Sequence, residues 1–115
     1  MEDLVMPYGV TIETNSDGGS SIVGDHPQKI GVGSLKLVPG PCRVVLSWGG
    51  PTKCQLVLAT KGERLTVAEV PSGGGGPRST MVTVGAREGD AIYARLFDAQ
   101  PGQTGTMEVY PMPAT

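Results

Sequence analysis

The chain has 115 residues, of which 18 are glycine and 10 are proline, and its net charge is −2. This length fits one domain, and so much glycine and proline argues against a helical protein, because both residues interrupt helices. The charge is too low to neutralise nucleic-acid phosphates or to bind an anionic membrane surface, and no apolar run approaches the roughly 20 residues that span a bilayer. We therefore expect a globular protein whose partners are neither nucleic acid nor membrane.

The N-terminal region, 1–33, lacks the regular alternation that marks the rest of the chain. The sequence NSDGG at 15–19 predicts a turn, so residues 10–24 could form a first hairpin. Residues 1–8 hold few candidates for a core and favour an arm that orders against a neighbouring molecule. Glu2 and Asp3 stand where a secretory signal would carry Lys or Arg, so we expect no export by that route. Residues 1–33 are predicted to be an N-terminal arm with or without a first hairpin.

From residue 34 onward, short segments alternate apolar and polar side chains with the two-residue period of β-strands. The segments are 34–39, 42–48, 53–60, 63–70, 80–86, 91–98 and 106–111. Strands about 8–12 residues apart, with turn residues between them, are typical of a sandwich or a small barrel. We predict an all-β fold over residues 34–115, a single antiparallel β-sandwich, jelly-roll or immunoglobulin-like, with about seven to nine short strands.

The alternation also predicts which side chains form the core. The expected inward residues are Leu35, Leu37, Val44, Leu46, Trp48, Leu56, Leu58, Leu65, Val67, Val82, Val84, Ile92, Leu96, Met107 and Val109. Val45 and Val57 are expected to be exposed. The link GGPT at 49–52 predicts a hairpin between 42–48 and 53–60, with Trp48 opposite Lys53. Cys42 and Cys54 would then lie too far apart for a disulfide and are expected to be free and buried.

The stretch PSGGGGPRS at 71–79 could be a phosphate-binding loop, a linker between domains or a long turn. It lacks the Lys-Ser/Thr pair and the following helix of a phosphate-binding loop. As a linker it would leave two pieces too short to bury separate cores. We therefore expect a loop between strands that either moves freely or lies against another backbone, with Gly74 and Gly75 as candidate contacts.

No residue pattern in the chain supports catalysis or metal binding. His26 is the only histidine and precedes Pro27, so we expect a turn residue rather than a zinc ligand or a member of a catalytic triad. The NSDGG segment lacks the later carboxylates of a calcium loop. A catalytic pocket would need a nucleophile and a base together. We expect no catalytic residues, no cofactor and no metal.

The outward face of the last strands is the strongest candidate for a binding surface. Tyr93 and Phe97 fall on the outward phase with Arg95 between them, and Tyr110 falls on the outward phase of the last strand. The chain has three Tyr, one Trp and one Phe, so placing three of them outside the core is costly unless something covers them. This face is expected to contact a protein or a sugar. Alternatively, N-terminal residues fold over it, or a bulge shifts the alternation.

Two resemblances involve these residues. The run RVVLSWGGPTKCQLVLATKGERL and the later run VTVGAREGDAIYARLFDAQPGQTGTMEVYP resemble the bacterial pre-peptidase C-terminal type of β-sandwich over the C-terminal part of the chain. That resemblance implies an accessory domain of a secreted enzyme. In size, glycine- and proline-rich all-β build and N-terminal segment, the whole chain also resembles the head decoration (cement) proteins of tailed bacteriophages. This second resemblance implies a small protein, often a trimer, that binds a finished capsid and stiffens it.

We therefore expect a non-enzymatic structural protein of the virion, made in the host cytoplasm, that decorates or cements a bacteriophage capsid. Its expected partners are the major capsid protein or other virion subunits, and further copies of itself, with a trimer favoured. The alternative is a carbohydrate- or surface-binding β-sandwich module with Trp48, Tyr93, Phe97 and Tyr110 as stacking residues. The expected interface residues are Leu4, Val5, Met6, Tyr8, Tyr93, Arg95, Phe97, Tyr110, Gly74 and Gly75.

Overall fold

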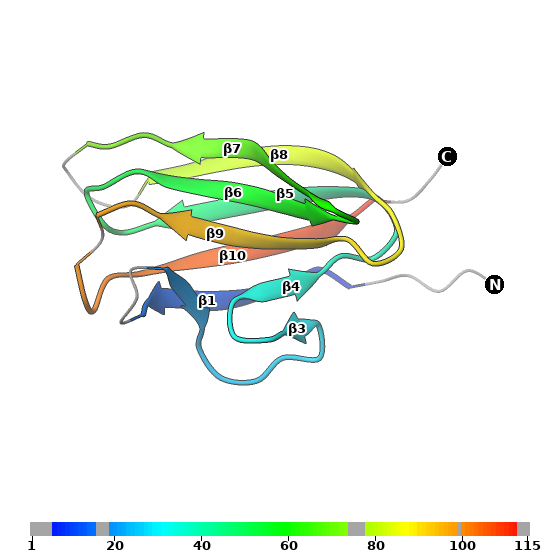
Figure 1. The fold of residues 1–115 in the computed structure, drawn as a ribbon, viewed down its shortest axis with the longest axis horizontal. Helices are drawn as coiled ribbons and strands as arrows, with labels where there is room; N and C mark the ends of the chain where they lie inside the picture. Colours follow the sequence, from blue (N-terminus) through cyan, green and yellow to red (C-terminus); the bar gives the residue numbers. More distant parts are fainter. Residues whose placement is uncertain (1–5, 16–18, 74–77, 99, 113–115) are drawn as a thin grey trace.

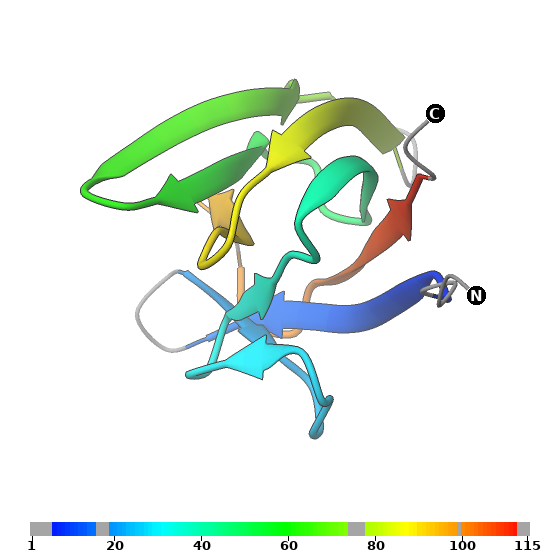
Figure 2. The ribbon, with the colours of Figure 1, turned by 90° about the vertical axis from the view of Figure 1, so that its right-hand side faces the viewer.

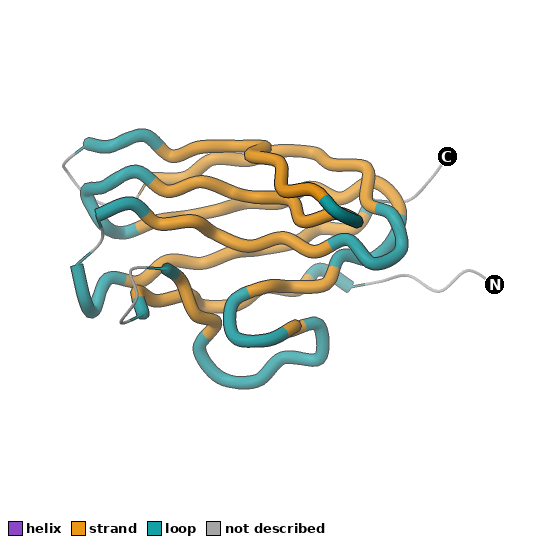
Figure 3. The backbone as a smooth tube through the Cα atoms, in the orientation of Figure 1, coloured by secondary structure: helices purple, strands orange, loops and turns teal. Residues whose placement is uncertain are grey.

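The computed structural model describes residues 6–15, 19–73, 78–98 and 100–112, which form two five-stranded antiparallel sheets packed face to face (Figures 1 and 2). Sheet A has the order β2 (Ser20–Ile22), β1 (Tyr8–Thr14), β10 (Thr104–Pro111), β5 (Gly40–Trp48) and β8 (Arg78–Ala86). Sheet B has the order β3 (Lys29–Ile30), β4 (Ser34–Lys36), β9 (Ala91–Leu96), β6 (Cys54–Thr60) and β7 (Glu63–Val70). The described residues contain strands and loops and no helix (Figure 3). The predicted all-β sandwich is confirmed, with slightly more strands than expected.

The path of the chain between the sheets identifies the sandwich as a jelly roll. Without the short strands β2 and β3, the sheets are β1-β10-β5-β8 and β4-β9-β6-β7. Every step along these eight strands crosses to the other sheet, except the β6–β7 hairpin. This is the double-sheet winding of a jelly roll, and it differs from the immunoglobulin arrangement of four strands against three.

The core lies between the two sheets and is filled by the alternating apolar residues of each strand. Most predicted inward residues are buried: Leu35, Leu37, Val44, Leu46, Trp48, Leu56, Leu58, Val84, Ile92, Leu96, Met107 and Val109. Ile12 and Ile22, from the N-terminal region, join the same core. Each such side chain contributes about 1.5–3 kcal/mol through its removal from water, so the alternation that predicts the strands also supplies the driving force for folding.

The burial of side chains departs from the prediction on β6 and β7, whose pairing register shifts at a bulge between Leu56 and Val57. Val57, expected to be exposed, is fully buried, whereas Leu65, expected in the core, is 43% exposed. Val57 lies outside the core cluster, between Tyr93 on β9 and Thr66 on β7. Leu65 lies on β7, an edge strand that pairs only with β6 among the described strands. Val67 and Val82, also expected inside, are half-buried.

The predicted hairpin between 42–48 and 53–60 is wrong, because β5 and β6 belong to different sheets. The link turns tightly beside Trp48: a Cβ on Gly50 would lie 2.9 Å from Trp48 Nε1 and 2.8 Å from Gln103 Oε1. Glycine therefore lets the chain cross between the sheets over the indole ring. Cys42 and Cys54 consequently lie in facing sheets, and both are free and buried as expected.

The N-terminal region predicted to hold an arm or a first hairpin contains β1 and β2, which pair antiparallel. Asn15 closes their turn, since its side-chain oxygen accepts a hydrogen bond from the Gly19 N–H at 2.9 Å. β1 also pairs with β10 along six residues. Residues 1–5 lie outside the described residues.

The glycine-rich stretch connects β7 in sheet B to β8 in sheet A. Residues 74–77 lie outside the described residues, but both flanks are attached to the loop between β5 and β6. The Gly73 N–H donates to the Pro51 carbonyl at 2.9 Å, and Arg78 Nη2 donates to the carbonyls of Gly50 and Thr52. Hydrogen bonds to backbone carbonyls therefore join the two flanks of the glycine-rich stretch to the loop between β5 and β6.

Candidate functional site

The structure separates the residues that the sequence placed on one aromatic surface. Tyr93 and Arg95 lie on the outward face of β9 in sheet B, and Phe97 follows them. Tyr110, 37% exposed, lies on the outward face of sheet A, on the opposite side of the sandwich. The prediction of a single surface containing Tyr110 with the β9 residues is therefore wrong. A strand's alternation gives its inward and outward faces, but it does not say which sheet the strand joins.

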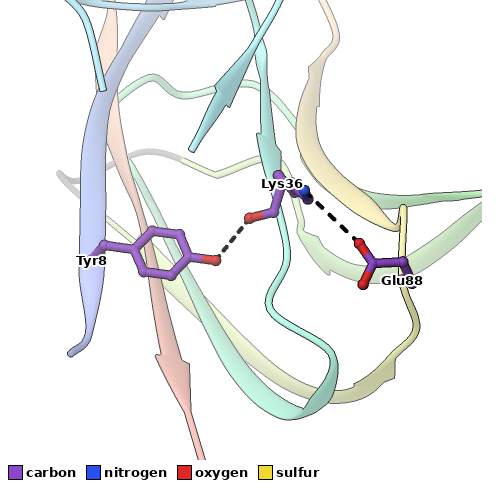
Figure 4. Close-up of polar contacts among 3 residues, drawn as sticks. All are labelled: Tyr8, Lys36 and Glu88. Carbon is purple, nitrogen blue, oxygen red and sulfur yellow. Dashed lines mark hydrogen bonds and ion pairs between the residues drawn. The ribbon is translucent and has the colours of Figure 1, made fainter. Parts of the chain in front are cut away.

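Tyr8 serves as a bridge between the two sheets (Figure 4). Its hydroxyl donates a hydrogen bond of 2.8 Å to the Lys36 carbonyl, at the end of β4, and its ring lies 5.6 Å from the His26 ring. Burial raises the pKa of Tyr8 to about 12. Tyr8 is thus engaged within the fold, while Met6, just before β1, is 74% exposed. Leu4, Val5, Gly74 and Gly75 lie outside the described residues.

A hollow of about 490 Å³ opens beside β9, between the outside of sheet B and the start of β2 in sheet A. We call it the β9 groove and define it by Ile30 and Val32 on one wall and by Arg64, Tyr93 and Arg95 on the other. Ile30 is 46% exposed and Val32 is 68% exposed. The groove therefore combines two exposed aliphatic side chains with a tyrosine and two arginines, and only Tyr93 and Arg95 were singled out from the sequence.

The tight β3–β4 hairpin creates the apolar wall of the groove. Ile30 pairs with Ser34, and Gly31 between them has a φ of +65°, a value that favours glycine. Ser34 in turn pairs with Tyr93 and brings the hairpin beside β9. A Cβ on Gly33 would lie 2.7 Å from the Ser20 carbonyl oxygen, so only glycine lets this hairpin pack against β2. The sequence KIGVGS thus presents its two aliphatic side chains at a fixed position.

The opposite wall of the groove carries positive charge without a partner in the described part of the chain. Arg95 forms no ion pair or hydrogen bond there, and Arg64 donates only to the backbone carbonyl of Glu63, at 3.1 Å. The nearby carboxylate of Glu69 accepts a hydrogen bond of 2.8 Å from Gln55. Among the residues that the structure describes, no acidic side chain lines the groove. Its two guanidinium groups can therefore bind carboxylates of another molecule.

Two further aromatic residues lie at the end of the sandwich where β5 ends. Trp48 is fully buried, so it cannot stack on a ligand, and its proposed role as a stacking residue is wrong. The Phe97 ring is covered by Lys53, whose Nζ lies 4.3 Å from the ring centroid. Arg78 lies opposite Trp48 on β8, and its Nε and Nη1, like Trp48 Nε1, are buried without a hydrogen-bond partner among the described residues.

His26, Asp90 and the two cysteines are engaged within the fold. His26 Nδ1 accepts a hydrogen bond of 3.0 Å from the Gln28 N–H, as a turn residue does. Asp90 is 4% exposed, and its carboxylate accepts a hydrogen bond of 2.9 Å from the Arg87 N–H. Burial raises the pKa of Cys54 to about 12 and also raises that of Cys42, so both thiols stay protonated near neutral pH. Within the described ranges, no three His, Cys, Asp or Glu side chains gather where they could hold a metal ion, and no helix could cross a membrane.

Neither a scan against protein-family models nor a search of curated proteins finds a match to this chain.

Proposed function

We propose that this protein is a non-enzymatic structural protein that binds the subunits of a bacteriophage capsid and stabilises the assembled shell. The observation that carries the proposal is the β9 groove, which is lined by exposed Ile30 and Val32 together with Tyr93, Arg64 and Arg95. Aromatic residues and arginine around an apolar centre are the composition enriched in protein–protein interfaces. The partner's contacting segment is expected to be extended, apolar and acidic.

The fold alone does not choose between the two functions considered from the sequence. Jelly rolls occur in viral capsid proteins and in lectins, and a fold does not determine a function. The groove favours a protein ligand, because one of its walls is aliphatic. Of the four residues considered for sugar stacking, Trp48 is buried and Phe97 is covered by Lys53.

The repeating surface of a capsid would strengthen binding through a small groove. The capsid surface repeats the same binding position many times, so a protein with more than one contact, or with linked copies, gains affinity through effective concentration. Weak single contacts then suffice for a stable coat.

Binding to phage heads tests this proposal. We expect a major capsid gene near the gene for this chain, and we expect the purified protein to co-sediment with heads assembled from that capsid protein. Val32→Asp should abolish co-sedimentation, because it places an anion in the apolar wall. The matched control is Val23→Asp, since Val23 is 49% exposed and lies outside the groove.

Two results would contradict the proposal. In the first, the protein ignores the heads and instead binds immobilised glycans. In the second, the protein binds the heads, but the Val32→Asp and Val23→Asp variants bind equally well, which would exclude the groove.

A further inference from the structure

The edges of the two sheets differ in how well they are protected against pairing with another strand. β2 and β3 are edges of only three and two residues. β7 is longer, but it carries Glu63, Arg64 and Glu69 and contains a bulge. Short strands, charges and bulges are the devices by which natural sheets prevent edge-to-edge association. Three of the four edges in the described residues are protected in these ways.

β8 forms the fourth edge and has none of these devices. It runs for nine residues from Arg78 to Ala86, and it pairs with β5 in an unbroken register from Gly40–Ala86 to Trp48–Arg78. Its sequence from 79 to 86, STMVTVGA, contains no charged residue and no proline. Arg78, at its start, turns its guanidinium inward to the carbonyls of Gly50 and Thr52. The edge is therefore long, regular and uncharged.

The outward side chains of β8 are also accessible. Ser79, Met81, Thr83 and Gly85 are exposed, and Met81 is 59% exposed. β7, the edge of the facing sheet, lies close to β8 but belongs to the other ladder and does not pair with it. Outside its ladder with β5, no backbone hydrogen bond of β8 is found among the described residues.

We propose that β8 pairs antiparallel with β8 of a second copy of this chain, around a two-fold axis at Val82. Val82 then faces its own counterpart, Met81 faces Thr83, and Thr80 faces Val84. Apolar and β-branched residues are favourable cross-strand partners, and no like charges oppose each other along the uncharged segment. On β7, by contrast, the charged residues Glu63, Arg64 and Glu69 and the bulge interrupt the edge. The edge of β8 is thus complementary to itself.

The product is a closed dimer in which the two A sheets form one continuous sheet of ten strands. A two-fold pairing uses up both β8 edges, so association ends at two copies. A single strand pair is small beside the roughly 1,200–2,000 Å² of stable protein interfaces, so monomer and dimer should exchange with concentration. This inference replaces the trimer suggested by resemblance to decoration proteins. It is independent of the proposed function, because the β9 groove lies on sheet B and stays free.

The dimer is tested by measuring molar mass as a function of protein concentration, with light scattering and sedimentation equilibrium. The wild-type mass should rise from 11.9 kDa toward twice that value. In Met81→Lys/Thr83→Lys, a lysine of each copy faces a lysine of the other at two symmetric positions. The association constant should fall roughly tenfold or more, because like charges directly opposite each other destabilise a strand pair.

A matched control adds the same two charges elsewhere. Thr11→Lys/Gln100→Lys alters two exposed positions away from β8 and should dimerise as the wild type does. Thermal unfolding of both variants shows whether the sandwich is intact. A wild-type protein that stays monomeric at the highest concentrations would overturn the proposal. So would assemblies larger than a dimer, or a β8 lysine variant that folds and dimerises normally.

Discussion

The contact between β10 and β5 at Gly105 leads to a sharp prediction about stability. Gly105 pairs with Trp48, and a Cβ added to it would lie 2.9 Å from Trp48 Cε3 and would also overlap the Ser47 carbonyl oxygen. β10 is held between β1 and β5, so it cannot move away from either. Gly105→Ala should therefore destabilise the fold, although alanine is ordinarily the better strand residue.

The size of the effect follows from two opposed contributions. Forcing an atom into a packed site costs about 1–3 kcal/mol, and the clash with a backbone atom favours the upper part of that range. Replacing glycine by alanine recovers about 0.5–1 kcal/mol of chain entropy. The net loss is about 2 kcal/mol, which corresponds to a fall in Tm of roughly 10 °C for a domain of this size.

The assay is reversible thermal or urea unfolding followed by the fluorescence of Trp48, the only tryptophan in the chain. Gly85→Ala is the matched control, because Gly85 also lies within a strand but a Cβ there would meet nothing within 4 Å. This control should be unchanged or slightly stabilised. Equal midpoints for Gly105→Ala and Gly85→Ala would refute the steric reasoning.

Further predictions concern the core, the sheet-bridging tyrosine and the buried thiols. Leu46→Ala, at a fully buried site of β5, should cost about 2–5 kcal/mol in urea unfolding, and a cost below about 1 kcal/mol would contradict its central position. Tyr8→Phe, which removes the hydrogen bond to the Lys36 carbonyl, should cost about 0.5–1.5 kcal/mol. Because burial raises the pKa of Cys54 from 9.0 to about 12, its contribution to stability is complete below pH 9 and is lost as the pH rises towards 12. Stability should fall by up to about 1.4 kcal/mol per pH unit in that window. Cys54→Ala should flatten this fall, and an unchanged alkaline slope would show that Cys54 does not cause it.

The strands were largely predictable because each has one buried face. From β4 to β10, the period-two segments correspond to observed strands, and the alternation correctly placed residues such as Val44 and Met107 in the core. The pairing of strands was not predictable in the same way. The glycines and proline of 49–52 indicate a turn, but a return within one sheet and a crossing to the other use the same turn residues. The burial of Val57 and the exposure of Leu65 depend on which strands lie beside β6 and β7, and no pattern in the sequence indicates that arrangement.

The candidate site was only partly predictable. Tyr93 and Arg95 stood out because an aromatic residue and an arginine alternate with core residues of β9. Ile30 and Val32 lie in the region 1–33, where the lack of regular alternation predicts no face for them, although two aliphatic residues flanking a glycine are an available signal for an exposed apolar loop. Arg64 joins the groove from β7, which is distant from β9 in the chain. Only the sheet order brings it near Tyr93.

The most direct test of the central claim is a cryo-electron-microscopy reconstruction of phage heads, assembled from the capsid protein encoded beside this gene, after incubation with the purified protein. We predict added density that fits the jelly roll at repeated positions, with Ile30, Val32 and Arg95 against the shell. Heads without added density, or a coat in which the β9 groove faces solvent, would contradict the account.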